Sequence, residues 1–105
     1  MAAPPFAQVP TNLIYKGKYM KTIHKYQLDP RDLNLSLPVG AKLLAAQEQN
    51  NQICVWAEVD TEADTELVGF EVFGTGHEMT DAPREYIGTA FIDGGGFVFH
   101  IYKMI

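Results

Sequence analysis

The stretch Glu85-Tyr-Ile-Gly-Thr-Ala-Phe-Ile-Asp-Gly-Gly-Gly-Phe-Val-Phe-His-Ile-Tyr-Lys-Met104 consists of two apolar, aromatic-rich segments around three consecutive glycines. Isoleucine, valine, threonine and the aromatic residues favour strands, whereas glycines supply the positive φ angles that a tight turn requires. The stretch therefore predicts an antiparallel β-hairpin, with strands over residues 85–92 and 97–104.

The rest of the chain continues in the same way, with short apolar stretches separated by turn residues. Residues 33–37 alternate leucine with polar residues, which is the period of a half-buried strand. Residues 41–47 suit a helix as well as a strand, but Asn50-Asn51 is a good hairpin turn and favours the strand. Further strands are predicted over residues 22–28, 52–59 and 67–73, with an acidic loop over 58–66 and a longer loop over 74–83. The expected fold is all-β, a small antiparallel β-sandwich or a partly open barrel.

The chain has 105 residues, which is enough for one domain with a modest core. Residues 1–19 contain Pro4, Pro5 and Pro10 and show no periodicity, so we expect an extended N-terminal arm there. A single β domain is expected over residues 20–105, beginning at Met20. No apolar run approaches the roughly 18 residues of a membrane-spanning helix, and the N-terminus does not resemble a signal peptide.

Cys54 is the only cysteine, which excludes an internal disulfide. It lies in the apolar run 53–57, and no His, Lys or Arg adjoins it in sequence. A buried, inert thiol is therefore favoured over a reactive one. Together with the absence of a signal peptide, this predicts a cytoplasmic protein.

Charge is distributed unevenly along the chain. Residues 1–31 carry five basic and one acidic residue, a balance of +4, and residues 32–105 carry three basic and twelve acidic residues, a balance of −9. A basic segment on an acidic body can lie across that body or across a neighbouring copy of it. Nucleic acid is not an expected partner of the acidic body.

The predicted strand over residues 97–104 is apolar on both faces, with Phe97, Phe99 and Ile101 on one side and Val98 and Tyr102 on the other. A sheet this small must cover its second apolar face, because each large apolar side chain left in water loses the roughly 1.5–3 kcal/mol of stabilisation that its burial would contribute. We therefore expect a homo-oligomer, in which a sister copy or the arm covers that face.

The candidate ligand loop is Gly74-Thr75-Gly76-His77, which combines backbone freedom, a hydroxyl and a titratable ring. It suits a small anionic or nucleotide-like ligand bound through bare amides. The competing interpretation is a strand that ends in a glycine-rich turn. A dinucleotide-binding fingerprint is excluded, because no third glycine and helix follow.

Further residues suit the same site. Tyr86, Thr89, His100 and Trp56 offer hydroxyls, an imidazole and rings for stacking, although core packing explains each of them as well. Cations for an anionic ligand are expected from Lys21, Lys25 and Arg84.

No metal or cofactor is expected. His24, His77 and His100 lack metal-ligand spacing, and there is no second cysteine. The acidic residues from Asp60 to Glu71 resemble a calcium loop, but Thr65 stands where glycine is needed, so a solvated loop is favoured.

Five blocks carry a family resemblance. In this order, they resemble a family of small uncharacterised proteins of bacteriophages and prophages over about residues 20–103. The resemblance implies a phage setting, hence the bacterial host cytoplasm, and a compact β domain, but no mechanism. The blocks are Leu37-Pro-Val-Gly-Ala-Lys-Leu-Leu44, Trp56-Ala-Glu-Val-Asp60, Phe73-Gly-Thr-Gly-His77, Tyr86-Ile-Gly-Thr89 and Val98-Phe-His-Ile-Tyr102.

Three functions are compatible with these features. The favoured one is a non-catalytic, homo-oligomeric phage-type binding protein that sequesters a small anionic or nucleotide-like host molecule, an anti-defence role. The second is a structural or interaction protein, such as a virion accessory or a host-protein inhibitor, that assembles through its arm. The third is a hydrolase with His77 and His100 as an acid–base pair.

Overall fold

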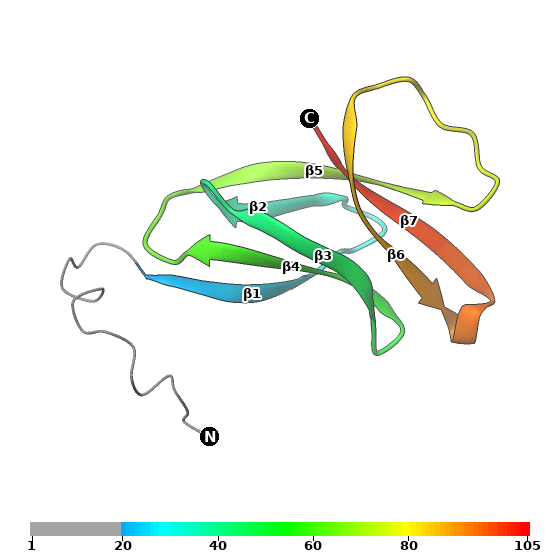
Figure 1. Ribbon diagram of the computed structural model, residues 1–105, viewed down its shortest axis with the longest axis horizontal. Coiled ribbons are helices and arrows are strands. Elements are labelled where there is room, and N and C mark those ends of the chain that lie inside the picture. Colours follow the sequence, from blue (N-terminus) through cyan, green and yellow to red (C-terminus); the bar gives the residue numbers. More distant parts are fainter. Residues whose placement is uncertain (1–19) are drawn as a thin grey trace.

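The computed structural model describes residues 20–105, and strands make up most of this part of the chain (Figure 1). The turn between β6 and β7 includes a one-turn 3₁₀ element, η2 (Asp93–Gly95). The all-β prediction is confirmed, including a strand instead of a helix after Gly40. The strands are β1 (Lys21–Gln27), β2 (Asn34–Pro38), β3 (Lys42–Gln49), β4 (Gln52–Asp60), β5 (Thr65–Gly74), β6 (Arg84–Ile92) and β7 (Phe97–Met104).

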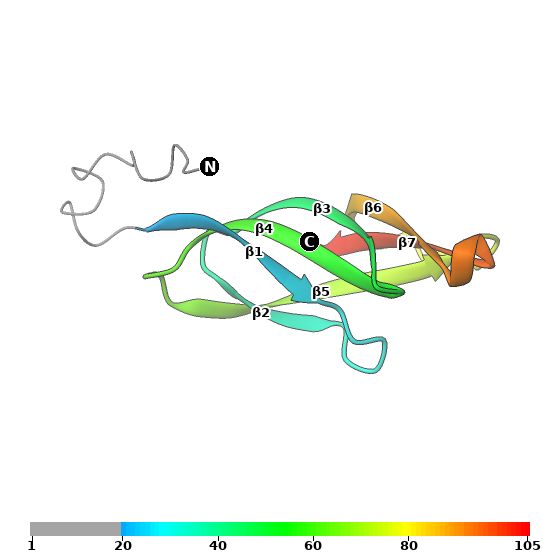
Figure 2. The ribbon, with the colours of Figure 1, turned by 90° about the horizontal axis from the view of Figure 1, so that it is seen from below.

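Two antiparallel sheets stack as a sandwich and do not close into a barrel. One sheet has the strand order β1-β4-β3, and the other has the order β2-β5-β7-β6. β5 belongs to two ladders, because its first half pairs with β2 and its second half with β7. Figure 2 shows the layers edge-on, with β1 and β4 on one side and β2 and β5 on the other.

Two hairpin turns at the same end of the sandwich hold the sheets together. Asn50 and Asn51 turn β3 into β4 with φ angles of 53° and 62°, as the predicted two-residue turn requires. Asp93, at a φ of 54°, begins the turn from β6 into β7. Asn51 Nδ2 donates to Asp93 Oδ1 at 2.8 Å, and the Asp93 amide donates to Asn51 Oδ1 at 2.7 Å. This reciprocal pair ties a turn of one sheet to a turn of the other.

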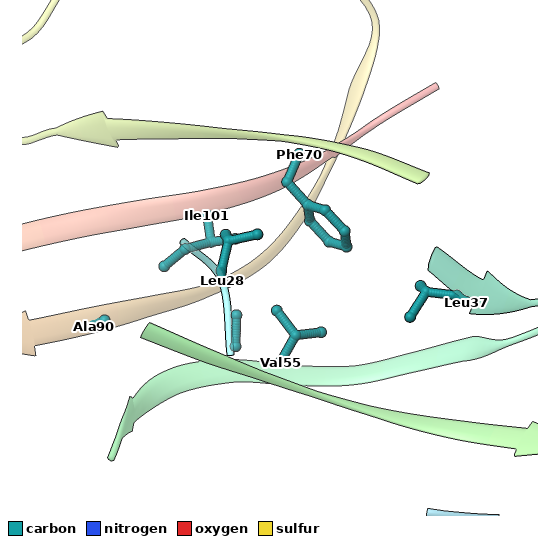
Figure 3. Packing of buried hydrophobic residues seen from close by; sticks show 7 residues of the cluster. Leu28, Leu37, Val55, Phe70, Ala90 and Ile101 are labelled. Atoms are coloured by element: carbon teal, nitrogen blue, oxygen red, sulfur yellow. The ribbon is translucent and has the colours of Figure 1, made fainter. Parts of the chain in front are cut away.

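The core lies between the sheets, where apolar side chains from both layers meet (Figure 3). Burying a large apolar side chain there stabilises the fold by roughly 1.5–3 kcal/mol. Cys54 is also buried and carries a free thiol, as the sequence predicted. The main cluster consists of Leu28, Leu37, Ala46, Val55, Phe70, Ala90 and Ile101.

The sheets approach most closely where β6 crosses β3. A methyl group built on Gly88 would overlap the carbonyl oxygen of Ala46 and lie 3.0 Å from its carbonyl carbon. A β-bulge between Tyr86 and Gly88 precedes this crossing. Only a residue without a side chain fits at this position.

The acidic loop is shorter than predicted. β4 extends to Asp60, because Glu58 pairs with Lys21 at 3.1 Å and Asp60 lies opposite Lys21 in the ladder. β5 begins at Thr65, because Thr65 lies opposite Pro38 of β2. The Asp60 carboxylate also accepts hydrogen bonds from the amides of Met20 and Glu62. The arm predicted over residues 1–19 lies outside the described residues. No helix in the described part of the chain is long and apolar enough to cross a membrane.

Candidate binding site

One face of the sheet β2-β5-β7-β6 points away from the core, because Phe70, Ala90 and Ile101 of the same strands point into it. We call this surface the outer face. It combines polar groups with large apolar side chains, of which Leu67 and Phe91 are 76% and 58% exposed. The outer face includes Leu67, Glu71, Phe73, Arg84, Tyr86, Thr89, Phe91, Val98, His100, Tyr102 and Met104.

A row of hydrogen-bonded side chains crosses the outer face from β6 to the end of β5. The Tyr86 hydroxyl lies 2.5 Å from Thr89 Oγ1, which lies 3.2 Å from His100 Nδ1. His100 Nε2 in turn lies 2.8 Å from Thr75 Oγ1. Thr89 and His100 are direct cross-strand partners, and Phe73 is the partner of His100 on β5. We call Tyr86, Thr89, His100 and Thr75 the polar row.

The polar row has one proton more than its internal bonds use. With a neutral imidazole, three hydroxyls and one ring N–H supply four protons for three hydrogen bonds. If the ring proton is on Nε2, every bond points toward Thr75, and the Thr75 hydroxyl is free to donate outward. If the proton is on Nδ1, the direction reverses, and Tyr86 is the outward donor. A ligand with one acceptor therefore selects the tautomer of His100 and the direction of the row.

The Gly74-Thr75-Gly76-His77 segment is a tight turn at the end of β5. The His77 amide donates to the Gly74 carbonyl at 3.0 Å, and the Gly74 amide donates to His77 Nδ1 at 3.2 Å. The Thr75 amide donates to the Val98 carbonyl at 3.2 Å, and Gly76 has a φ of 89°. Three of the four amides are therefore engaged within the chain, so the bare amides expected for an anion are not present here. The Thr75 hydroxyl faces His100 instead.

A depression of about 450 Å³ borders the Thr75 end of the polar row. Gly74, Thr75 and His77 line one side of it, and residues 96–99 line the other. The Tyr86 end of the row is open, because Tyr86 is 54% exposed. A ligand thus has access to an outward-facing hydroxyl at either end.

Arg84 is fixed by its neighbours. Its Nε donates to Glu71 Oε1 at 2.8 Å, and its Nη1 and Nη2 donate to the carbonyl and hydroxyl of Thr80, each at 2.8 Å. The guanidinium lies 5.1 Å from the Phe73 ring centroid and 5.9 Å from that of Tyr102. Its side chain is only 10% exposed. Arg84 therefore anchors the 74–83 loop to the sheet, and its charge is paired.

Aromatic rings next to the polar row pack against one another. Tyr102 packs edge to face against Tyr86, with ring centroids 5.4 Å apart, and against Phe73 at 5.8 Å. Such contacts fix ring orientations as well as burying area. The ring of Tyr86 is therefore held in place while its hydroxyl reaches Thr89.

Trp56, Lys21 and Lys25 do not join this site. All three belong to the sheet β1-β4-β3, where Lys25 lies opposite Trp56 in the ladder. Val55 and Ala57 point into the core, so Trp56 between them points outward from the opposite side of the sandwich. Lys21 pairs with Glu58, and Lys25 Nζ lies 2.5 Å from Gln49 Oε1.

Each of the three histidines has its own hydrogen-bond partners. His77 bonds to Gly74 and His100 to Thr75 and Thr89, so the two rings contact different residues of the turn. His24 lies on β1, where its Nδ1 is 3.5 Å from the Tyr26 hydroxyl. Within residues 20–105, no three His, Cys, Asp or Glu side chains are close enough to hold a metal ion.

All four members of the polar row were predicted as site residues, but no sequence pattern connected them. Glu71 and Thr80 were not predicted as partners of Arg84. A signal for Glu71 was present, because Glu71 and Phe73 share one face of a strand whose other face is apolar. Thr80 lies in a loop without periodicity, so no sequence pattern placed it near Arg84.

Comparison with known protein families assigns the chain to one of them. A family model described as "Domain of unknown function (DUF7352)" matches residues 20–105. The chain belongs to this family. No curated protein and no solved structure matches the chain. The DUF7352 domain thus includes both described sheets and every residue of the polar row.

Proposed function

We propose that the protein is a non-catalytic, homo-oligomeric binding protein that holds a small ring-bearing ligand at the polar row. The observation that supports this is the continuous row Tyr86–Thr89–His100–Thr75 within an exposed aromatic face. The row presents one outward donor and several acceptor lone pairs in fixed positions. Exposed rings beside it suit stacking of a planar ligand, which contributes roughly 1–3 kcal/mol per base in single-strand binding proteins.

The partners of His100 favour binding over hydrolysis. A catalytic histidine needs a nucleophile on one ring nitrogen and an orienting acid on the other. His100 has threonine hydroxyls on both nitrogens, so no carboxylate orients its ring as such a mechanism requires. Arg84, which lies on the same face, is paired with Glu71 and is not available to a developing oxyanion.

Charge restricts which part of the ligand contacts the row. Arg84 is neutralised, and Lys21 and Lys25 belong to the other sheet. We therefore expect an uncharged, hydrogen-bonding ring, such as the base of a nucleotide, at the row, with any phosphate directed away from it. In the phage setting that the resemblance implies, such a protein sequesters a host nucleotide-like molecule in the cytoplasm without transforming it.

The outer face is also the surface through which we expect copies to associate. It carries four large exposed apolar side chains, whereas the outward side of β1-β4-β3 carries mostly lysines and glutamines around the exposed Ile23. Covering the apolar face removes it from water, and the polar row would then lie between copies. The four exposed side chains are Leu67, Tyr86, Phe91 and Met104.

The ligand proposal is tested by thermal shift with a panel of nucleosides and of linear and cyclic nucleotides. We expect at least one to raise the melting temperature of the wild type, and the shift to disappear in Thr89→Val, which interrupts the row. Thr22→Val is the matched control, because Thr22 is exposed on β1 in the other sheet. No shift with any compound on the folded wild type, or an equal shift in Thr89→Val, contradicts the proposal.

The association proposal is tested by light scattering of the full chain. Phe91→Lys on the outer face should lower the native mass to that of one chain, whereas Ile23→Lys should not. Ile23 is the matched control, because it has the same exposure, 58%, on the opposite side of the sandwich. Assembly through residues 1–19 is the alternative, and it predicts the reverse: Phe91→Lys keeps the mass and removal of residues 1–19 lowers it.

A further inference from the structure

A second cavity lies between the sheets, at the end of the sandwich where β1 ends and the β3–β4 and β6–β7 hairpins turn. Its volume is about 440 Å³, within the range of roughly 300–1,000 Å³ that is typical of small-molecule sites. Both sheets contribute to its walls, so it is an internal recess and not a groove on one face. Its apolar lining includes Leu28, Leu33, Ile53, Val72, Ile92 and Phe99.

The rim of this cavity is held by hydrogen bonds on the β1–β2 side. The Asp29 carboxylate accepts from the Arg31 amide at 2.9 Å and from its guanidinium at 3.1 and 3.2 Å. These bonds lower the pKa of Asp29 below its usual value and keep the carboxylate ionised. The Leu28 amide donates to the Ile53 carbonyl at 2.9 Å, which ties the segment to β4.

On the opposite side, the rim is held by the Asn51–Asp93 pair, which joins the turns of the two sheets. The Asn51 amide also donates to Glu48 Oε2 at 2.7 Å. Both sides of the opening are therefore fixed by hydrogen bonds within the chain. The recess is a built feature of the fold and does not depend on an occupant to hold its walls apart.

The chemistry of the lining specifies the ligand. The polar residues among the lining are Gln27, Asn51 and Gln52, and none of the lining residues is charged. A charged ligand would lose its hydration there without gaining a counter-ion. An apolar body is stabilised by the aliphatic and aromatic walls, and an amide side chain at the rim can bond to one polar end.

We propose that this cavity is a binding site for an uncharged small molecule with an apolar ring body and one hydrogen-bonding end. No member of the polar row lines this cavity, although Phe99 borders both the cavity and the depression beside Thr75. Val72, Ile92 and Phe99 line the cavity from the inner face of the four-stranded sheet, whereas Phe73 and His100 lie on the outer face of the same strands. The proposal therefore stands independently of the proposed function.

The test uses N-phenyl-1-naphthylamine, an uncharged fluorescent probe with an apolar ring body and one N–H donor, and the full chain. We expect saturable 1:1 binding with a rise in fluorescence. Val72→Phe and Ile53→Phe, which fill the cavity from different sheets, should weaken binding at least tenfold. Val39→Phe is the matched control, because it makes the same change at an exposed position that lines neither this cavity nor the depression beside Thr75, and it should leave binding unchanged.

Circular dichroism identifies which variants are folded, and two filling variants are used so that one misfolded variant does not decide the outcome. Probe binding that is unchanged in both folded filling variants overturns the proposal, as does the absence of binding to the wild type. Isotope-filtered NOEs locate the probe: contacts with the Ile53 and Val72 methyl groups support the proposal. Contacts of those methyl groups with residues 1–19 in place of the probe overturn it, because the chain itself then fills the cavity.

Discussion

Gly88 determines how closely β6 can approach β3. We expect Gly88→Ala to destabilise the protein by about 2–3 kcal/mol, since the new methyl group overlaps the Ala46 carbonyl and overpacking costs typically 1–3 kcal/mol. Urea denaturation followed by circular dichroism measures this change.

The control for this prediction is Gly96→Ala. Gly96 has a φ of −65°, and a methyl group added to it would lie 3.4 Å from its nearest neighbour, the Asp93 carbonyl oxygen. The unfolding free energy of this variant should stay within about 0.5 kcal/mol of the wild type. If the two variants lose the same amount of unfolding free energy, then Gly88 is not required for the close approach of the sheets.

Arg84 is needed for its shape as well as its charge. Arg84→Lys should lower the free energy of unfolding by about 1–2 kcal/mol, because an ammonium group cannot bond to Glu71 and both oxygens of Thr80 while stacking on Phe73. Arg31→Lys is the matched control. Arg31 also pairs with a carboxylate but is 89% exposed, so the unfolding free energy of this variant should stay close to that of the wild type. A loss for Arg84→Lys as small as that for Arg31→Lys contradicts the anchoring role.

The two hairpins at the cavity end are elements that depend on each other. In a double-mutant cycle of Asn51→Gly and Asp93→Gly, we expect a coupling energy of about 1 kcal/mol from the Asn51–Asp93 side-chain bond. Glycine is chosen because both positions have positive φ angles, so the turns remain unstrained.

Chemical denaturation of the four proteins in this cycle provides the measurement. A coupling energy of zero would mean that each hairpin is stable without the other and that the Asn51–Asp93 hydrogen bond does not contribute to stability. The double mutant also bears on the cavity, since its rim would lose the link between the sheets while its apolar lining stays intact.

The domain as a whole should fold without residues 1–19. Every member of the main core cluster lies between Leu28 and Ile101, and the described strands of both sheets lie within residues 21–104. We therefore expect removal of residues 1–19 to change the unfolding free energy by less than about 1 kcal/mol, within the range of surface changes. A loss of cooperative unfolding in the shortened chain would show that those residues contribute to the core.

Strand positions were predictable because they follow from local chemistry. Alternating leucines around Ser36, the Asn50-Asn51 turn and the glycines after Asp93 each restrict the backbone within a few residues. The acidic loop was predicted too long because its two ends pair with distant segments, one with β1 and the other with β2. Likewise, Gly74-Thr75-Gly76-His77 was correctly located at a strand end, but its amides bond to its own carbonyl and ring and to Val98.

What the sequence by itself determined is therefore the set of strands, their turns and the identity of the polar groups on them. Which of those groups meet was decided only by the tertiary structure, because strand order and register bring together residues distant in the chain. Thr75, Thr89 and His100 form one row because β7 lies between β5 and β6, whereas Trp56 lies on the opposite side because β4 belongs to the other sheet. Period-two alternation fixes the two faces of each strand but does not specify the neighbouring strand.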